Sequence, residues 1–178
     1  MTIIKIIDTI IIILNETGEY FLKVELIHKK KNDVLFTYRV AGLVINDNKL
    51  LVAKRVDHPV YYIIGGGVEI NETSEEAIIR EIMEETGLKL NIAKLAYIQE
   101  RFLKVNEIKH HEIVFFYLME VKTDIKITNN TFTDQGFKET LHWLPLGQLK
   151  KYNIVPDFLK HKSLKNIGGI EHIISKEY

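Results

Sequence analysis

Three glutamates, Glu81, Glu84 and Glu85, lie close together in a segment whose apolar spacing predicts a helix. At about 100° per residue, their side chains fall within one arc of roughly 100° around that helix. Such like charges repel each other, and Arg80 is the only basic residue between positions 73 and 88. A divalent cation would remove the repulsion, because carboxylates are hard oxygen ligands suited to Mg²⁺, Mn²⁺ or Ca²⁺. Taken alone, the cluster favours an ordinary solvated helix face, because most acidic helix faces are simply solvated.

The segment before the helix is suited to phosphate. Gly65, Gly66 and Gly67 directly follow the short apolar run Val60–Ile64, which predicts a strand. Glycines let the backbone approach a phosphate closely, and N–H groups near the start of a helix favour anions. An acidic cluster and a candidate phosphate loop are therefore adjacent in the sequence.

The helix itself is predicted over Thr73–Thr86. Thr73 and Glu76 form a possible capping box, and Gly87 is a natural C-terminal stop. Opposite the glutamates we expect a core face, made by Ile78, Ile79, Ile82 and Met83.

The other elements must position this loop and helix. The predicted strands are Val34–Ile45, Lys49–Arg55, Leu90–Val105, His111–Val121 and Thr140–Leu144, and Pro145–Tyr152 and Pro156–His161 are predicted as short helices. Strands joined partly as hairpins and mixed with helices predict an α/β fold with a mixed sheet.

The loop and helix together resemble the Nudix box. Gly66, Glu72 and the run Arg80–Leu88 match its defined positions at the right spacing. Two neighbouring positions depart from the usual pattern, because Ile64 stands where proline is common and Asn71 where glycine is common. Asparagine tolerates left-handed backbone angles, and neither change removes a ligand.

The resemblance implies a Nudix-type α/β/α sandwich with a central mixed β-sheet, in which the catalytic loop and helix follow a strand. It implies that Glu81, Glu84 and Glu85 bind Mg²⁺, with Mn²⁺ as a substitute, and that the Gly65 carbonyl is an added ligand. Glu72 and Arg80 would support the loop and orient the glutamates. The expected substrate contacts are Gly66, Gly67, Arg39 and Arg55.

The general base is left open by the resemblance. Glu81 is the first candidate, and Glu112 and Glu100 lie outside the box as further candidates for base or added ligand. The histidine pair His110 and His111 could touch phosphate or form an exposed turn.

The reaction implied by the resemblance is cleavage of a diphosphate linkage in a small nucleotide-type substrate. ADP-ribose, a (d)NTP and a dinucleoside polyphosphate all remain open, because Lys104 stands where some subfamilies carry a marker proline or tyrosine. The alternative is an inactive Nudix-fold domain that binds nucleotides or regulates. Such a domain usually loses one of Arg80, Glu81, Glu84 or Glu85, so their presence favours the enzyme.

The composition limits which partners and which cellular locations are expected. The 178 residues contain 24 basic and 24 acidic side chains and no cysteine, which argues against a nucleic-acid surface and excludes disulfides. The isoleucine-rich stretch Met1–Leu14 is too short to span a membrane, and its β-branched residues favour a strand. We therefore expect a cytoplasmic monomer or homodimer with no membrane partner. Residues 1–33 would form a β extension packed on a Nudix domain at 34–178.

Overall fold

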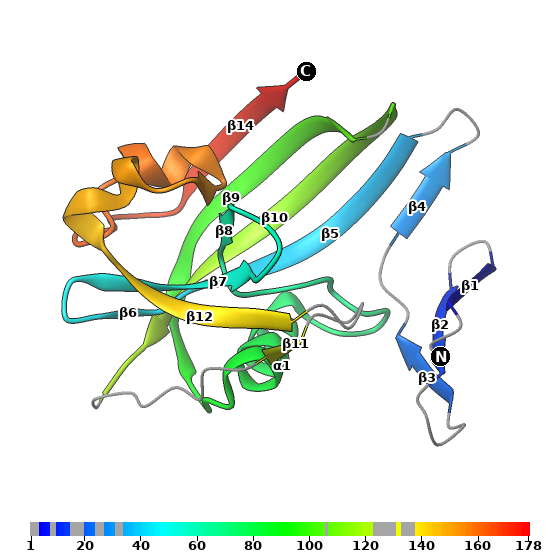
Figure 1. Cartoon of the computed structure of the whole chain (residues 1–178), viewed down its shortest axis with the longest axis horizontal. Helices are drawn as coiled ribbons and strands as arrows, with labels where there is room; N and C mark the ends of the chain where they lie inside the picture. The colour runs from blue at the N-terminus through cyan, green and yellow to red at the C-terminus, as the bar shows by residue number, and fades with distance from the viewer. Residues whose placement is uncertain are drawn as a thin grey trace.

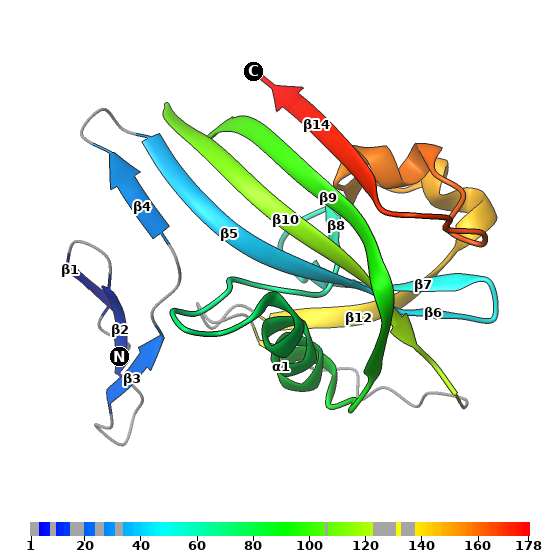
Figure 2. The ribbon, with the colours of Figure 1, turned by 180° about the vertical axis from the view of Figure 1, so that it is seen from behind.

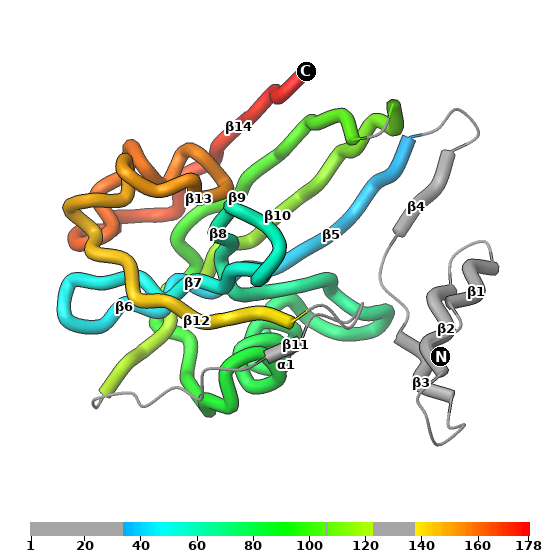
Figure 3. The backbone as a smooth tube through the Cα atoms, in the orientation of Figure 1, coloured from blue at the N-terminus to red at the C-terminus, as the bar shows by residue number. Residues whose placement is uncertain are grey.

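The computed structural model describes residues 34–105, 107–122 and 138–178, and the backbone of short strands in the rest of the chain (Figure 3). The described elements, drawn in Figure 1, are β1 (Ile4–Ile7), β2 (Ile10–Leu14), β3 (Tyr20–Lys23), β4 (Ile27–Lys30), β5 (Val34–Leu43), β6 (Ile45–Asn46), β7 (Lys49–Arg55), β8 (Tyr61–Tyr62), α1 (Ser74–Thr86), β9 (Asn91–Val105), β10 (Ile108–Glu120), β11 (Thr131–Phe132), β12 (Lys138–Pro145), the 3-10 helix η1 (Leu146–Lys151), β13 (Ile154–Val155), the 3-10 helix η2 (Asp157–His161) and β14 (Glu171–Glu177).

The largest sheet is mixed and carries the long strands. Its order is β14-β9-β10-β5-β4, with β10 antiparallel to β9 and parallel to β5. A second sheet has the order β11-β12-β7-β8-β13, with β6 paired to β7. This arrangement confirms the predicted α/β fold with a mixed sheet.

The first apolar core fills the space where the two sheets face each other. Leu43 and Phe116 from the main sheet pack there with Leu50 from the second sheet, and all three are almost fully buried. Leu159 of η2 joins the same core, so the C-terminal turns close one end of it. Successive residues of β5 and β7 point to opposite faces, so Leu43 and Leu50 join this core while Val44 and Leu51 join the second.

The second core lies beneath α1, which packs against one end of the main sheet (Figure 2). Ile78 and Ile82 are fully buried there, and Gly42 of β5 allows the helix to approach closely. A Cβ on Gly42 would lie 2.6 Å from Cδ1 of Ile82. The helix thus rests on the strand through a glycine contact.

The predicted core face of α1 is partly wrong. Ile79 and Met83 are exposed, at 39% and 50%, and Ala77 is buried in their place. The buried arc is centred on Ala77, Ile78 and Ile82 because the sheet contacts only a narrow stripe of the helix. The termini of α1 agree with the prediction, since Thr73 forms the complete capping box with Glu76.

Several strands differ from the predicted ones. The first predicted strand divides into β5 and β6, while the second, β7, has the predicted bounds. The two C-terminal segments are 3-10 helices, and β13 and β14 were not predicted at all. β14 follows Gly168 and Gly169 and lies at the edge of the main sheet, where its residues alternate in exposure with little apolar character.

The N-terminal residues contribute strands to two sheets. β1, β2 and β3 pair with each other as an antiparallel sheet, whereas β4 pairs with β5 at the edge of the main sheet. Among the described residues, no helix has the length and apolar character needed to cross a membrane.

Candidate active site

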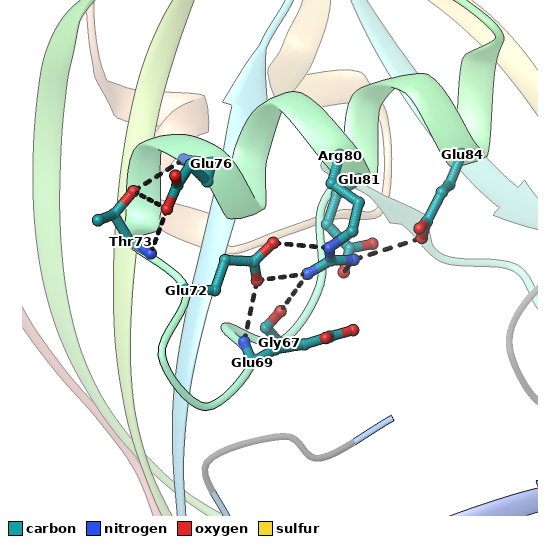
Figure 4. A network of polar contacts seen from close by, with 8 residues as sticks. All are labelled: Gly67, Glu69, Glu72, Thr73, Glu76, Arg80, Glu81 and Glu84. Atoms are coloured by element: carbon teal, nitrogen blue, oxygen red, sulfur yellow. Dashed lines mark hydrogen bonds and ion pairs between the residues drawn. The ribbon is translucent and has the colours of Figure 1, made fainter. Parts of the chain in front are cut away.

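Arg80 is the centre of the polar network on the box helix (Figure 4). Its Nε and Nη2 donate to the two carboxylate oxygens of Glu72, both at 2.8 Å. Nη2 also donates to the Gly67 carbonyl at 3.1 Å, and Nη1 donates to Glu81 at 2.7 Å and to Glu84 at 3.3 Å. These bonds, led by the one to Glu72, raise the pKa of Arg80. One guanidinium therefore ties the glycine loop to the helix.

Glu72 connects Arg80 to the backbone of the loop. Besides its fork to Arg80, its Oε2 accepts the backbone N–H of Glu69 at 3.0 Å. Asn71, the residue before it, has a φ of 66°, so the left-handed angle expected at this departure from the usual glycine is present. The supporting role expected for Glu72 and Arg80 matches the contacts they make.

The glycine loop lies directly against the helix carboxylates. A Cβ on Gly66 would lie 2.3 Å from Oε1 of Glu81, so only glycine leaves room for that side chain. Gly65 has a φ of 150°, and a Cβ there would lie 2.2 Å from the carbonyl oxygen of Val40. The loop is held by β5, because the Val40 N–H donates to the Gly66 carbonyl at 2.9 Å.

Glu85 is a partly buried member of the three box glutamates. Burial raises its pKa well above the ordinary range, and the charges of Glu81 and Glu139 raise it further. The Gly65 N–H donates to its carboxylate, and this bond together with the charge of Arg39 opposes the rise. Glu85 therefore lies near two other carboxylates, Glu81 and Glu139, and near the positive charge of Arg39.

Glu139 was not among the predicted site residues. It lies on β12 with 8% of its surface exposed, and its charge acts on Glu85. It belongs to the inward-facing series Glu139, Leu141, Trp143, of which the last two pack in the core beneath α1. A carboxylate in an otherwise apolar, inward-facing series is the sequence signal that would have identified it.

Each of the two predicted substrate arginines lies near a member of this carboxylate group. Arg39 on β5 is close enough for its charge to act on Glu85. Arg55 on β7 is the cross-strand neighbour of Glu139 and forms a fork with Asp57, at 3.0 Å and 2.7 Å. The structure therefore brings Arg39, Arg55, the glycines and the box residues to one site.

Divalent-cation chemistry suits the donors present. The charges of Glu81 and Glu139 raise the pKa of Glu85, and the side chain of Glu84 is half exposed. Among the described residues, no group of three His, Cys, Asp or Glu side chains is arranged to hold a metal ion. Arg80 forms ion pairs with Glu81 and Glu84 in this arrangement. The donor set fits a hard cation by its charge and atom type.

The other candidate bases make different contacts. Glu112 accepts from Arg101 at 3.2 Å and from Thr37 at 3.5 Å. Glu100 contacts His172 at 2.9 Å in an exposed position on the opposite face of the sheet. Neither is among the carboxylates that act on Glu85. His111, one of the histidine pair, stacks on Phe102 with ring centroids 4.3 Å apart.

Comparison with known proteins extends the local resemblance. The chain is 50% identical over 52 residues to an ADP-ribose pyrophosphatase of Methanocaldococcus jannaschii, covering 28% of this chain and 31% of that protein. It is 37% identical over 62 residues to a MutT-like protein of Streptomyces ambofaciens, covering 34% and 40%. These matches span only about a third of each relative.

Solved structures extend the likeness to the fold. A MutT protein from Bacillus halodurans superposes with a TM-score of 0.55 at 16% identity, covering 70% of this chain and 78% of that one. This likeness confirms the Nudix-type sandwich as the fold. The NUDIX domain model matches residues 35–162, which is well over half of the chain. The chain therefore belongs to the NUDIX domain family.

Proposed function

We propose that this protein is a Mg²⁺-dependent hydrolase that cleaves the diphosphate linkage of a nucleoside diphosphate joined to another group. The observation that supports the proposal is the largely buried carboxylate group of Glu81, Glu85 and Glu139, with Arg39 near Glu85 and Arg55 beside Glu139. Carboxylates whose charges raise each other's pKa are suited to a divalent cation. Two arginines beside them are suited to phosphate oxygens.

Each side chain then has a distinct task. Glu81, Glu84 and Glu85 would hold the Mg²⁺ ions, with the Gly65 carbonyl as an added ligand. When bound, Mg²⁺ neutralises phosphate oxygens and acidifies water. Arg39 and Arg55 would bind and orient the diphosphate, while Arg80 keeps the box carboxylates in place through its bonds to Glu72 and Glu81.

Glu139 is our candidate for the group that takes the proton from the attacking water. It lies on β12, across from the box helix, so it can approach the diphosphate from the side opposite the helix ligands. Glu81 is engaged by Arg80 at 2.7 Å, and Glu112 is engaged by Arg101 and Thr37. Glu139 is preferred because its charge acts on Glu85, whereas Glu112 is not among the carboxylates that act there.

The alternative function is an inactive NUDIX domain that only binds nucleotides. The complete box argues against it, because Arg80, Glu81, Glu84 and Glu85 are all present, and Arg80 bonds to both Glu81 and Glu84 (Figure 4). The named activity of the archaeal relative, an ADP-ribose pyrophosphatase, favours cleavage of a nucleoside diphosphate derivative.

The test is product release from ADP-ribose, ATP, dGTP and a dinucleoside polyphosphate, with Mg²⁺ and with EDTA. We expect cleavage of at least one compound with Mg²⁺ and none with EDTA. If the folded protein binds Mg²⁺ but cleaves none of the four, the binding-domain alternative replaces the hydrolase.

Replacing Glu139 by Gln tests the proposed base. We expect kcat to fall by about 10²- to 10⁴-fold with little change in KM, because general-base catalysis typically contributes that much. Glu120→Gln is the matched control, since Glu120 is a partly exposed strand glutamate paired with Lys122. If Glu112→Gln lowers kcat more than Glu139→Gln does, the base is Glu112.

A further inference from the structure

The face of the main sheet that carries α1 continues beyond the helix as an apolar surface. Phe36 of β5, His111 of β10 and Phe102 of β9 are cross-strand neighbours in one row of this face. The His111 ring stacks on Phe102 with centroids 4.3 Å apart and contacts Phe36 edge-on at 5.3 Å. Ile113 shares the face, and two residues further along β10 Phe115 packs on the core beneath α1 (Figure 2). We call Phe36, Phe102, His111 and Ile113 the aromatic face.

The apolar members of the aromatic face are used by neither core. Phe36, Phe102 and Ile113 are each partly buried and, among the side chains that the structure describes, belong to neither apolar core. The opposite side of the same strands is polar at this level, where Arg101 pairs with Glu112. A sheet face that meets water normally carries polar residues, so an apolar face indicates a surface that another element covers.

The chain that precedes β4 starts at the edge of this face. β4 pairs with β5, and the register places Ile27 beside Thr37 and His28 beside Phe36. β3 ends at Lys23 and β4 begins at Ile27, so the backbone between these two residues reaches at most about 14 Å. Stacked sheets lie about 10 Å apart. A sheet that contains β3 can therefore lie on the main sheet without a longer connection.

The N-terminal sheet of β1, β2 and β3 needs such a partner surface. The three strands pair only with each other among the described elements, in the order β1-β2-β3. Every residue of β2, Ile10–Leu14, is apolar, so both faces of this central strand are apolar. Continuous apolar runs are typical of strands that are covered on both sides. A sheet of three short strands has no second layer of its own to provide that cover.

We infer that the N-terminal sheet β1–β3 packs on the aromatic face of the same chain. The opposite face of the main sheet is unsuitable, because apolar strands there would remove the bonded charges of Arg101, Glu112 and Glu177 from water. Three strands about 4.8 Å apart are about as wide as β5, β10 and β9 together. The short connection to β4 holds the N-terminal sheet at a high local concentration beside this face, which favours the same chain over a second copy.

Chemical cross-linking in the full-length chain tests the contact. The chain contains no cysteine, so two introduced thiols are the only ones that react. Ile113→Cys is combined with Ile11→Cys or with Ile12→Cys, because adjacent residues of β2 point to opposite faces. The probe is a bismaleimide that spans about 10 Å, the distance between stacked sheets. The control pairs the same β2 substitutions with Ile45→Cys, another partly buried isoleucine, on β6 of the second sheet.

For one of the two β2 positions we expect a cross-linked monomer that forms at least about tenfold faster with Ile113→Cys than with Ile45→Cys. Equal rates for the two sites would overturn the inference, because a sheet that is not docked has no preference for the aromatic face. Cross-linked dimers in place of monomers would also overturn it, since a second copy would then cover the face. No substrate is involved, so either failure leaves the proposed function unaffected.

A second measurement uses the labelling rate of Ile113→Cys with N-ethylmaleimide. Adding Ile11→Asp or Ile12→Asp places a carboxylate in β2, and an unpaired charge is costly to bury between two apolar surfaces. We expect one of these substitutions to speed the labelling of Ile113→Cys at least about tenfold, which corresponds to a shift from mostly docked to mostly undocked. The labelling rate of Ile45→Cys should stay the same. Unchanged labelling of Ile113→Cys with both substitutions would contradict the docking.

Discussion

At the scale of single residues, the site depends on close contacts between the glycine loop and the side chains of the box helix. Gly66 and Glu81 are neighbours because a glycine leaves space for the carboxylate, and Arg80 then fixes Glu81 from the other side. Arginine suits this position because its planar fork donates to two oxygens of Glu72 at once, which a lysine cannot do. The position of Glu81 therefore depends on both Gly66 and Arg80.

Replacing Gly66 by Ala should damage activity more than stability. The added Cβ would lie 2.3 Å from Oε1 of Glu81, so the carboxylate must move away from its place. We expect kcat/KM to fall by at least about tenfold, because a misplacement of about 1 Å at a catalytic group can have a hundredfold effect. The measurement is steady-state kinetics on the best substrate.

Gly87→Ala is the control for that substitution. Gly87 has a φ of 71° at the end of α1, and a Cβ there would meet no atom within 4 Å. It should lower the free energy of unfolding by about 1 kcal/mol and leave kcat/KM nearly unchanged. Equal losses of activity in the two variants would mean that the close contact of Gly66 with Glu81 has no special importance.

The box residues could be predicted from the sequence because they are contiguous and their spacing is defined. Glu72 and Arg80, expected to support the loop, do contact it. Glu139 could not be predicted in the same way, because it reaches Glu85 only through the pairing of β12 with β7. A partner from a distant strand depends on tertiary structure, which local spacing does not encode.

At the scale of elements, α1 shows where periodicity alone is insufficient. The apolar positions Ile78, Ile79, Ile82 and Met83 predict a broad core face, but only Ile78 and Ile82 are buried. Gly42 lets the helix sit close to β5, so a narrow stripe fills the contact and leaves Ile79 and Met83 outside it. The width of a buried stripe depends on the partner surface, which the helix sequence does not specify.

Adjacent positions on α1 should therefore respond very differently to truncation. Ile82→Ala should lower the free energy of unfolding by about 2–5 kcal/mol, because it leaves a cavity in a fully buried site. Met83→Ala should change it by no more than about 0.5 kcal/mol, because Met83 is half exposed. Urea unfolding of both variants measures the difference. Comparable losses would show that Met83 is covered in solution.

The edge strand β14 shows a second limit of sequence patterns. Its alternation is too weak in apolar residues to mark a strand, yet it pairs in parallel with β9 along seven residues. Polar contacts hold it there, including those of Gln99 with Ser175 and Arg101 with Glu177. Tertiary hydrogen bonds have replaced the apolar pattern on which strand prediction depends.

At the scale of the whole molecule, two sheets and one helix bring distant residues to a single point. Arg39 comes from the main sheet, Arg55 and Glu139 from the second sheet, and the box glutamates from α1. The two apolar cores hold these elements in place, because residues of β5 contribute to both of them. The α/β class and the mixed sheet could be predicted from strand and helix patterns, whereas the pairing order of the sheets could not.

The most direct test of the central claim is the turnover number of Glu85→Gln with saturating Mg²⁺, measured beside Glu75→Gln. Glu75 is an exposed glutamate in the first turn of the same helix, so it controls for the loss of one helix charge. We predict that Glu85→Gln lowers kcat by at least about a hundredfold, because it removes a metal ligand, and that Glu75→Gln leaves kcat nearly unchanged. An unchanged kcat in Glu85→Gln would contradict the assignment of these carboxylates as the metal site of a diphosphate hydrolase.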